Sequence, residues 1–255
     1  MVKKLLLFFE REISGLHEAA YLLGFFALIS QLLGFWRDRL LASSFGAGEA
    51  LDIYYAAFRV PDLIFILSAS MVSLSVLIPF LSKKREESKE VAREFLDSVF
   101  SGFFAFILVL SALTFFFAPQ LTELLFPGFT PDMLSHTAFL MRIMLLQPIL
   151  LGVSNLFASV TQLERRFFVY AVSPILYNVG IIIGVFLLYP ILGLSGLAWG
   201  VVLGALLHVG IQIPVMVRTG MFPRLRLSVD IPLLRPLWKS GKTFYQVLRH
   251  AQCRI

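Results

Sequence analysis

The sequence predicts an all-α integral membrane protein, built as a bundle of six transmembrane helices. Hydrophobic residues make up 58% of its 255 residues, and the mean hydropathy is +0.83. Charged residues account for only 15%, against about 25% in soluble domains. The apolar residues gather in runs that reach the roughly 20 residues needed to cross a bilayer. A soluble protein of this composition would expose large apolar patches to water, so the composition excludes that class.

Six apolar runs define the expected spans. In chain order they cover about Ala19–Trp36, Leu51–Leu81, Phe95–Ala118, His136–Val160, Phe168–Tyr189 and Leu194–Val217. The second run is long for one straight helix, since its residues would extend roughly 46 Å. Pro61 lies inside it and has no backbone N–H to donate. We therefore expect a kink in this helix near Val60–Asp62, or a break there that exposes backbone groups to a cavity.

The basic residues of the connections alternate between the two sides of the bundle. The connections Pro119–Ser135 and Pro190–Gly193 contain no Lys or Arg. The other connections and the segment after the last span are basic: Lys83, Lys84, Arg85, Lys89, Arg93, Arg165, Arg166, Arg218, Arg224 and Arg226. Because basic loops stay in the cytoplasm, both termini are expected there. The exception is the turn expected after the first span, which places Arg37 and Arg39 on the outer side.

The flanks divide the chain into three regions. Residues 1–18 are expected to form a cytoplasmic interfacial segment, because their apolar run is too short for a cleaved signal peptide. Residues 19–218 form the six-helix transmembrane lobe. Residues 219–255 are expected to form a basic cytoplasmic tail.

Three charged residues beside apolar runs are the main candidates for a binding site: Arg37, Asp52 and Arg59. Asp52 and Arg59 are seven residues apart, so they share a helix face about 10 Å apart along the axis. Arg37 is close enough in sequence to pair with Asp52 across the Phe45–Gly48 turn. One interpretation is a net basic cavity wall that binds a phosphate, because guanidinium groups donate paired hydrogen bonds. The alternative is interfacial snorkelling with one structural salt bridge.

Other polar residues within the spans allow weaker interpretations. Arg39 is a further cavity candidate, and Arg142 either reaches outward to the interface or faces the cavity. The amides of Gln31, Asn155, Asn178 and Gln212 indicate interhelical hydrogen bonds, and the pairs Gly180/Gly184 and Gly200/Gly204 indicate close helix packing.

The sequence contains no recognisable catalytic, metal or nucleic-acid motif. It has one cysteine and four scattered histidines, without a His-Glu-x-x-His pair, a Gly-x-Ser-x-Gly elbow or an acidic cluster. We therefore expect no enzyme activity, no metal, no cofactor and no nucleic-acid partner.

Several segments resemble the MurJ/MviN family, the lipid II flippases of the MOP exporter superfamily. The main resemblance lies in Leu33–Asp38, Phe45–Gly48, Asp52 and Ala57–Leu63. Further segments that fit are Pro127–Phe129, Ser173–Ile181 and Gly196–Gly204, so the resemblance covers about residues 20–225.

The resemblance implies one lobe of a two-lobed transporter in the bacterial inner membrane. Such a protein moves lipid II, an undecaprenyl-pyrophosphate-linked peptidoglycan precursor, to the outer leaflet by alternating access around a cationic cavity. The implied partners are this precursor, membrane lipids and a C-terminal lobe. Arg37 and Asp52 match family positions regarded as functionally important, and Arg59 matches a position that is usually basic.

The chain departs from the family pattern at several positions. It has Gln31 where the family often has Arg, Phe65 and Ile66 where basic residues are frequent, and Met71-Val72 where Gly-Ala is frequent. Family members are also roughly twice as long. We therefore expect an N-terminal half, produced by truncation, a frame shift or a split gene. The alternatives to a lipid II flippase are another MOP-type exporter of lipid-linked oligosaccharides and a non-transporting membrane fragment or subunit.

Overall fold

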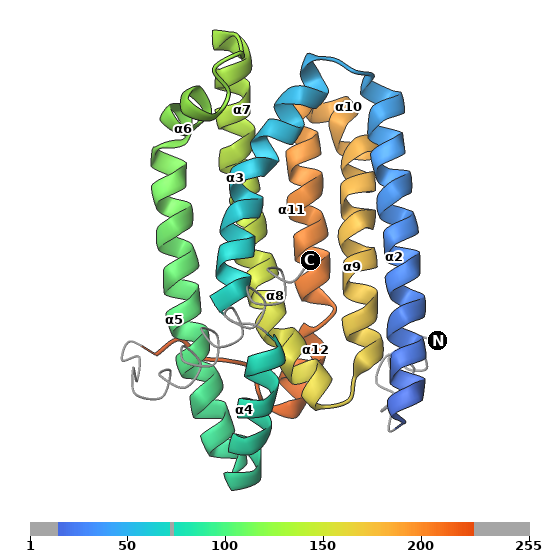
Figure 1. Cartoon of the computed structure of the whole chain (residues 1–255), viewed down its shortest axis with the longest axis vertical. Helices are drawn as coiled ribbons and strands as arrows, with labels where there is room; N and C mark the ends of the chain where they lie inside the picture. The colour runs from blue at the N-terminus through green and yellow to red at the C-terminus, as the bar shows by residue number, and fades with distance from the viewer. Residues whose placement is uncertain (1–14, 72–73, 227–255) are drawn as a thin grey trace, which may run out of the picture.

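The computed structural model describes residues 15–71 and 74–226, and the regular elements of this part are all helices. The long helices run side by side in one bundle (Figure 1). Five stretches are long and apolar enough to cross a membrane: His17–Phe45, Lys89–Phe116, Pro131–Leu163, Phe167–Leu192 and Leu194–Thr219. The all-α membrane class is confirmed, although the second of the six expected spans is not among these five. Most of the expected N-terminal segment and the tail beyond residue 226 lie outside the described residues.

Helix α2 (Leu16–Phe45) is longer than the first expected span, which was placed to end at Trp36. Arg37 and Arg39 therefore lie inside a helix, so their assignment to a turn is wrong, whereas their placement toward the outer side stays a prediction. The reason for the error is that charged residues lower hydropathy without opposing helix formation. The helix stops at Gly46, whose φ of 66° favours glycine.

The second expected span is divided into α3 (Glu49–Met71) and α4 (Leu74–Glu87), and α4 is offset from the axis of α3 (Figure 1). The described parts of this span therefore form two helices, and residues 72–73 between them lie outside the described residues. Four charged residues lower the hydropathy of α3: Glu49, Asp52, Arg59 and Asp62. Figure 1 shows α3 changing direction along its length, and the assignment of this bend to Pro61 stays a prediction.

The third and fourth spans are present with different limits. Helix α5 (Lys89–Phe116) begins with the Ser88 hydroxyl accepting a hydrogen bond from the backbone N–H of Val91. The expected outer loop 119–135 instead holds α6 (Ala118–Leu125) and the start of α7 (Pro131–Met144). Helix α8 (Leu146–Leu163) follows α7 after one residue, so the expected fourth helix is two consecutive segments.

The last two spans are also segmented. The fifth comprises α9 (Phe167–Ile183), the π-helix η1 (Gly184–Leu188) and α10 (Tyr189–Leu192), so the expected loop 190–193 is mostly helical. The sixth comprises α11 (Leu194–Gly210) and α12 (Ile213–Thr219). The basic connections around α4, α12 and the α8–α9 turn all lie at one end of the bundle, whereas α6 and α10 lie at the other (Figure 1).

Helices α9 and α11 pack with their backbones in close approach at glycines, as the spacing of small residues predicted. A Cβ atom on Gly180 would lie 2.2 Å from Cα of Gly204, and one on Gly184 would lie 2.6 Å from Cα of Gly200. Neither helix can carry a side chain at these points without separating from the other. The interface thereby fixes the position of α9, which contributes to the cavity described next.

Candidate functional site

One cavity has a volume of about 890 Å³ and is larger than a second, separate cavity beside α5 and Arg142. The larger cavity lies between α2, α3, α8 and α9, and α3 contributes most of its lining. Helix α2 packs mainly against α9, which leaves room between α2 and α3. The lining combines charged, phenolic and amide groups with apolar side chains. This mixture is typical of a binding site rather than of a packing defect.

Arg37 is held at the cavity wall by three hydrogen bonds. Its Nε and Nη2 both donate to Oδ1 of Asp38, at 2.9 and 2.7 Å, and its Nη1 donates to Oδ1 of Asn178 at 2.9 Å. Asn178 is buried on α9, and its Nδ2 donates to the carbonyl oxygen of Pro174. The bond between Arg37 and Asn178 joins α2 to α9, and it confirms the interhelical hydrogen bond expected of Asn178.

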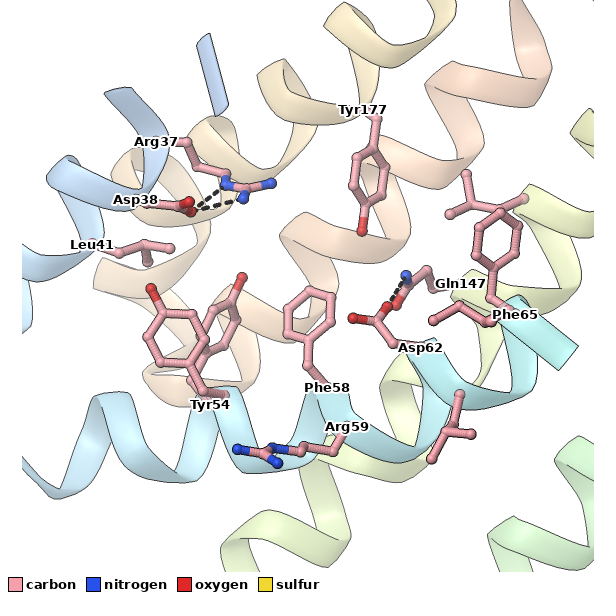
Figure 2. A pocket seen from close by; sticks show the side chains of 14 residues that line it. Arg37, Asp38, Leu41, Tyr54, Phe58, Arg59, Asp62, Phe65, Gln147 and Tyr177 are labelled. Atoms are coloured by element: carbon pink, nitrogen blue, oxygen red, sulfur yellow. Dashed lines mark hydrogen bonds and ion pairs between the residues drawn. The ribbon is translucent and has the colours of Figure 1, made fainter. Parts of the chain in front are cut away.

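Arg59 is the second cation of the cavity. It is exposed on α3 and extends along that helix, away from Asp62 (Figure 2). Within residues 15–71 and 74–226, it makes no ion pair or hydrogen bond to a protein side chain. Its guanidinium group is therefore available to a ligand, in contrast to that of Arg37.

Asp62 and Gln147 connect α3 to α8 at the other side of the cavity. Nε2 of Gln147 donates to Oδ1 of Asp62 at 3.1 Å (Figure 2). Gln147 is only 2% exposed, and its Oε1 has no hydrogen-bond partner in the described part of the protein. A buried acceptor without a partner is uncommon, and it can accept a hydrogen bond from a ligand in the cavity.

Aromatic and aliphatic side chains complete the lining. Tyr54, Tyr55 and Phe58 come from α3, and Tyr177 comes from α9. Leu63, Phe65 and Ile66 continue the lining along α3 as an apolar strip. Phe65 and Ile66 are the positions where basic residues are frequent in the resembling family, so this part of the cavity wall has no cation.

The structure brings only two of the predicted binding residues to the cavity, Arg37 and Arg59. Asp52 and Arg39 are exposed and outside the lining, and Arg37 pairs with Asp38 rather than with Asp52. The expectation of a net basic cavity is wrong, because the lining carries two Arg and two Asp residues. The two negative charges come from Asp38 and Asp62, which were not among the predicted site residues, whereas Asp52 lies outside the lining.

Arg142 lies at a second cavity, which shares no lining residue with the first. Its Nε donates to the carbonyl oxygen of Phe115 at 3.1 Å, and its guanidinium carbon lies 5.3 Å from the centre of the Phe115 ring. Of the two alternatives for Arg142, the one that places it in the larger cavity is therefore wrong.

Sequence reasoning missed several residues of the larger cavity. Asp38 adjoins Arg37, and Asp62 lies three residues after Arg59 on the same helical face, so both could have been found from spacing. Tyr54, Tyr177 and Gln147 gave no such signal, because their approach depends on how α3, α8 and α9 pack.

Within the described residues, no group of three His, Cys, Asp or Glu side chains can hold a metal ion. Oγ of Ser154 lies 2.7 Å from Nδ1 of His208, and it also accepts from Nε2 of Gln212 at 2.5 Å. Ser154 is fully buried and lines neither cavity, and these contacts hold α8 against α11 and the connection between α11 and α12.

Comparison with known proteins places the chain in one family. The family described as "Lipid II flippase MurJ" matches residues 41–248. The probable lipid II flippase MurJ of Buchnera aphidicola subsp. Acyrthosiphon pisum is 32% identical over 221 residues, which cover 84% of this chain and 43% of that protein. The lipid II flippase MurJ of Burkholderia cenocepacia is 26% identical over 208 residues, covering 80% and 40%. The chain thus spans less than half the length of these curated relatives.

A solved structure supports the fold. The lipid II flippase MurJ in an inward closed conformation superposes with a TM-score of 0.69 at 24% identity, covering 87% of this chain and 47% of that one. Together with the apolar helices, these matches describe a multi-pass protein of a bacterial inner membrane. The chain belongs to the lipid II flippase MurJ family.

Proposed function

We propose that this chain supplies one lobe of a lipid II flippase and that its larger cavity binds the anionic headgroup of the lipid-linked precursor. The observation that carries the proposal is that one cavity contains two arginines, of which one is held by protein groups and the other is not. Arg37 is fixed by Asp38 and Asn178, whereas Arg59 has no protein partner among the described residues. In this proposal the fixed Arg37 determines the position of the pyrophosphate, and the side chain of Arg59 moves to bind it.

The charge balance of the cavity fits a reversible carrier. Two Asp residues offset the two Arg residues in the lining, so the phosphate competes with Asp38 for Arg37. Such competition keeps affinity moderate and favours release on the other side of the membrane. Asp52 stays a candidate that the lining does not include.

The uncharged polar groups suit the sugar and peptide part of the headgroup. Oε1 of Gln147 is a buried acceptor without a partner in the described region, and hydroxyl or amide groups of the ligand would donate to it. Tyr54, Tyr55 and Tyr177 add phenolic hydroxyls beside aromatic surface. The apolar strip at Phe65 and Ile66 is suited to isoprenoid carbon rather than to phosphate.

The transport step requires a second wall for the cavity. We propose that residues 19–218 form one rigid lobe and that a second lobe closes the cavity from the opposite side, so that rocking exposes it alternately to each leaflet. The basic end of the bundle, with α4 and α12, faces the cytoplasm in this proposal, which puts residues 1–18 and 219–255 on that side.

A second candidate is an exporter of another anionic lipid-linked oligosaccharide. The observation that favours it is the apolar strip, because Phe65 and Ile66 replace basic residues that are frequent in the family and so change the wall that faces the headgroup. Binding of lipid II in preference to an undecaprenyl-pyrophosphate-linked O-antigen sugar distinguishes the two candidates.

Binding of lipid II to the purified chain in detergent tests the proposal. Arg37→Ala and Arg59→Ala are each expected to weaken binding about tenfold or more, because each removes charge-assisted hydrogen bonds. Arg39→Ala is the matched control, since Arg39 lies on α2 but outside the lining. Equal affinity of all four proteins would refute the cavity as the headgroup site.

A further inference from the structure

The second cavity is an apolar groove of about 650 Å³ beside the end of α5 that leads to α6. Leu108, Phe115 and Phe116 of α5 form one wall, Phe139 of α7 belongs to the facing side, and Trp199 is contributed by α11. It shares no residue with the larger cavity. Its role is therefore separate from the proposed headgroup site.

Arg142 is the one charged residue of this lining. Its Nε is bound to the carbonyl oxygen of Phe115 and its guanidinium carbon lies near the Phe115 ring, so the group is held in place. No acidic side chain of the described residues pairs with it. A fixed cation between aromatic walls attracts an anion from outside the protein.

Ser111 supplies a second polar point within the same groove. Its side chain lines the groove, is only 4% exposed, and its Oγ has no hydrogen-bond partner in the described part of the protein. Ser111 precedes Phe115 by one helical turn, which places it about 6 Å further along α5 toward the middle of the bundle. Buried hydroxyls are normally satisfied, so this one points to an absent acceptor.

The order of groups along the groove defines the chemistry of its occupant. A cation lies at the level of the α5 end, a hydroxyl donor lies one turn deeper, and apolar side chains continue to Leu108 and Ile149. A phosphate followed by an ester carbonyl and then by hydrocarbon matches these three levels. A soluble anion would gain nothing from the aromatic walls, and a purely apolar molecule would satisfy neither Arg142 nor Ser111.

We propose that this groove is a binding site for an anionic glycerophospholipid of the surrounding membrane. The phosphate pairs with Arg142, an ester carbonyl accepts the hydrogen bond of Ser111, and one acyl chain lies against Leu108 and Trp199. The bound lipid supplies the counter-charge that the described protein residues do not give Arg142.

Trp199 makes the site measurable by fluorescence. The chain has three Trp residues, so Trp36→Phe together with Trp238→Phe leaves Trp199 as the only one. This protein is placed in bilayers that contain a low fraction of either phosphatidylglycerol or phosphatidylcholine with brominated acyl chains, which quench nearby Trp. We expect the association constant obtained from Trp199 quenching to be about fivefold higher for phosphatidylglycerol than for phosphatidylcholine. This factor corresponds to the attraction that one basic side chain near the membrane surface contributes.

Variants of the same protein assign the preference to the groove. Arg142→Gln is expected to reduce the preference to about one, and Ser111→Ala to lower it by a smaller factor. Arg165→Gln removes the same charge at the opposite end of the bundle and is expected to keep the full preference. Quenching by brominated phosphatidylcholine serves as the fold control, because it changes if the bundle is disrupted.

Three results would overturn the proposal. The first is equal quenching by the two phospholipids, and the second is a preference for phosphatidylglycerol that persists in Arg142→Gln. The third is displacement of brominated phosphatidylglycerol by undecaprenyl phosphate more effectively than by unbrominated phosphatidylglycerol, which would assign the groove to the isoprenoid substrate.

Discussion

Arg37 is oriented toward the cavity before any ligand arrives. Its side chain is 23% exposed, and Asp38 and Asn178 together restrain the guanidinium group. A long, flexible side chain loses rotamer entropy when it binds a ligand, and restraint in advance reduces that loss. Asp38 is the weaker restraint, because its side chain is 52% exposed and is shared with solvent. Asn178 is therefore the residue on which the position of Arg37 depends most.

Asn178→Leu is expected to weaken lipid II binding about tenfold by releasing Arg37, since it removes a hydrogen bond to a charged group. The measurement is a double-mutant cycle with Arg37→Ala, read as the dissociation constant for lipid II. In the Arg37→Ala background, Asn178→Leu should have no further effect, because its role is to hold Arg37. If the losses of binding free energy from the two substitutions add in the double variant, Asn178 acts on binding independently of Arg37. The restraint of Arg37 by Asn178 would then have no effect on lipid II binding.

At the scale of elements, the contact between α9 and α11 determines where Tyr177 and Asn178 lie. A Cβ atom on Gly204 would lie 2.3 Å from the carbonyl oxygen of Tyr177, which is backbone and cannot rotate away. Any side chain at residue 204 therefore pushes α9 from α11. Since α9 carries both Tyr177 and Asn178, a change on α11 that touches no ligand reaches the cavity.

Gly204→Ala is expected to destabilise the bundle by about 1–3 kcal/mol, the usual effect of overpacking. Gly210→Ala on the same helix is the matched control, because no atom lies within 4 Å of its added Cβ. That control should be neutral or stabilise by up to about 1 kcal/mol, since Ala is the better helix former. Thermal unfolding in detergent measures both variants. Equal melting temperatures for the two variants would contradict the close approach of the helices.

Two backbone N–H groups of the segment after α12 donate hydrogen bonds to side chains of α5. The N–H of Arg224 donates to Oδ1 of Asp97 at 2.8 Å, and the N–H of Arg226 donates to Oγ of Ser101 at 2.8 Å. Asp97 is only 2% exposed, and Nε of Arg226 lies 3.4 Å from its Oδ2. These contacts fix the direction in which the chain leaves the bundle.

Asp97→Leu is expected to release this segment and to speed amide hydrogen exchange at Arg224 about tenfold or more, because a backbone donor loses its acceptor. Asp97→Asn is the matched control, since its side-chain carbonyl still accepts the bond. Mass spectrometry of the peptide over residues 221–226 measures the rate of amide hydrogen exchange in both variants. Equal protection in Asp97→Leu and the parent protein would show that the segment is held by other contacts.

At the scale of the whole molecule, hydropathy predicted the class and most of the spans, because each helix must be apolar to face lipid. Hydropathy failed where a helix contains polar or charged residues. Residues 37–45 continue α2 although they interrupt the apolar run, and α3 is a helix with four charged residues. The cavity was predicted in part for a related reason: Arg37 and Arg59 are conspicuous as charges, whereas Gln147 and Tyr177 reach the cavity only through packing.

The orientation of the bundle is the remaining property of the whole molecule, and labelling tests it. Asp132 at the start of α7 and Glu86 at the end of α4 are both exposed carboxylates at opposite ends. In a Cys253→Ser background, which removes the only native cysteine, Asp132→Cys should react with a membrane-impermeant maleimide in intact spheroplasts. Glu86→Cys should react only after the membrane is permeabilised, because basic connections are retained in the cytoplasm. The reverse pattern would invert the bundle, and the groove at Arg142 would then draw its lipid from the cytoplasmic leaflet.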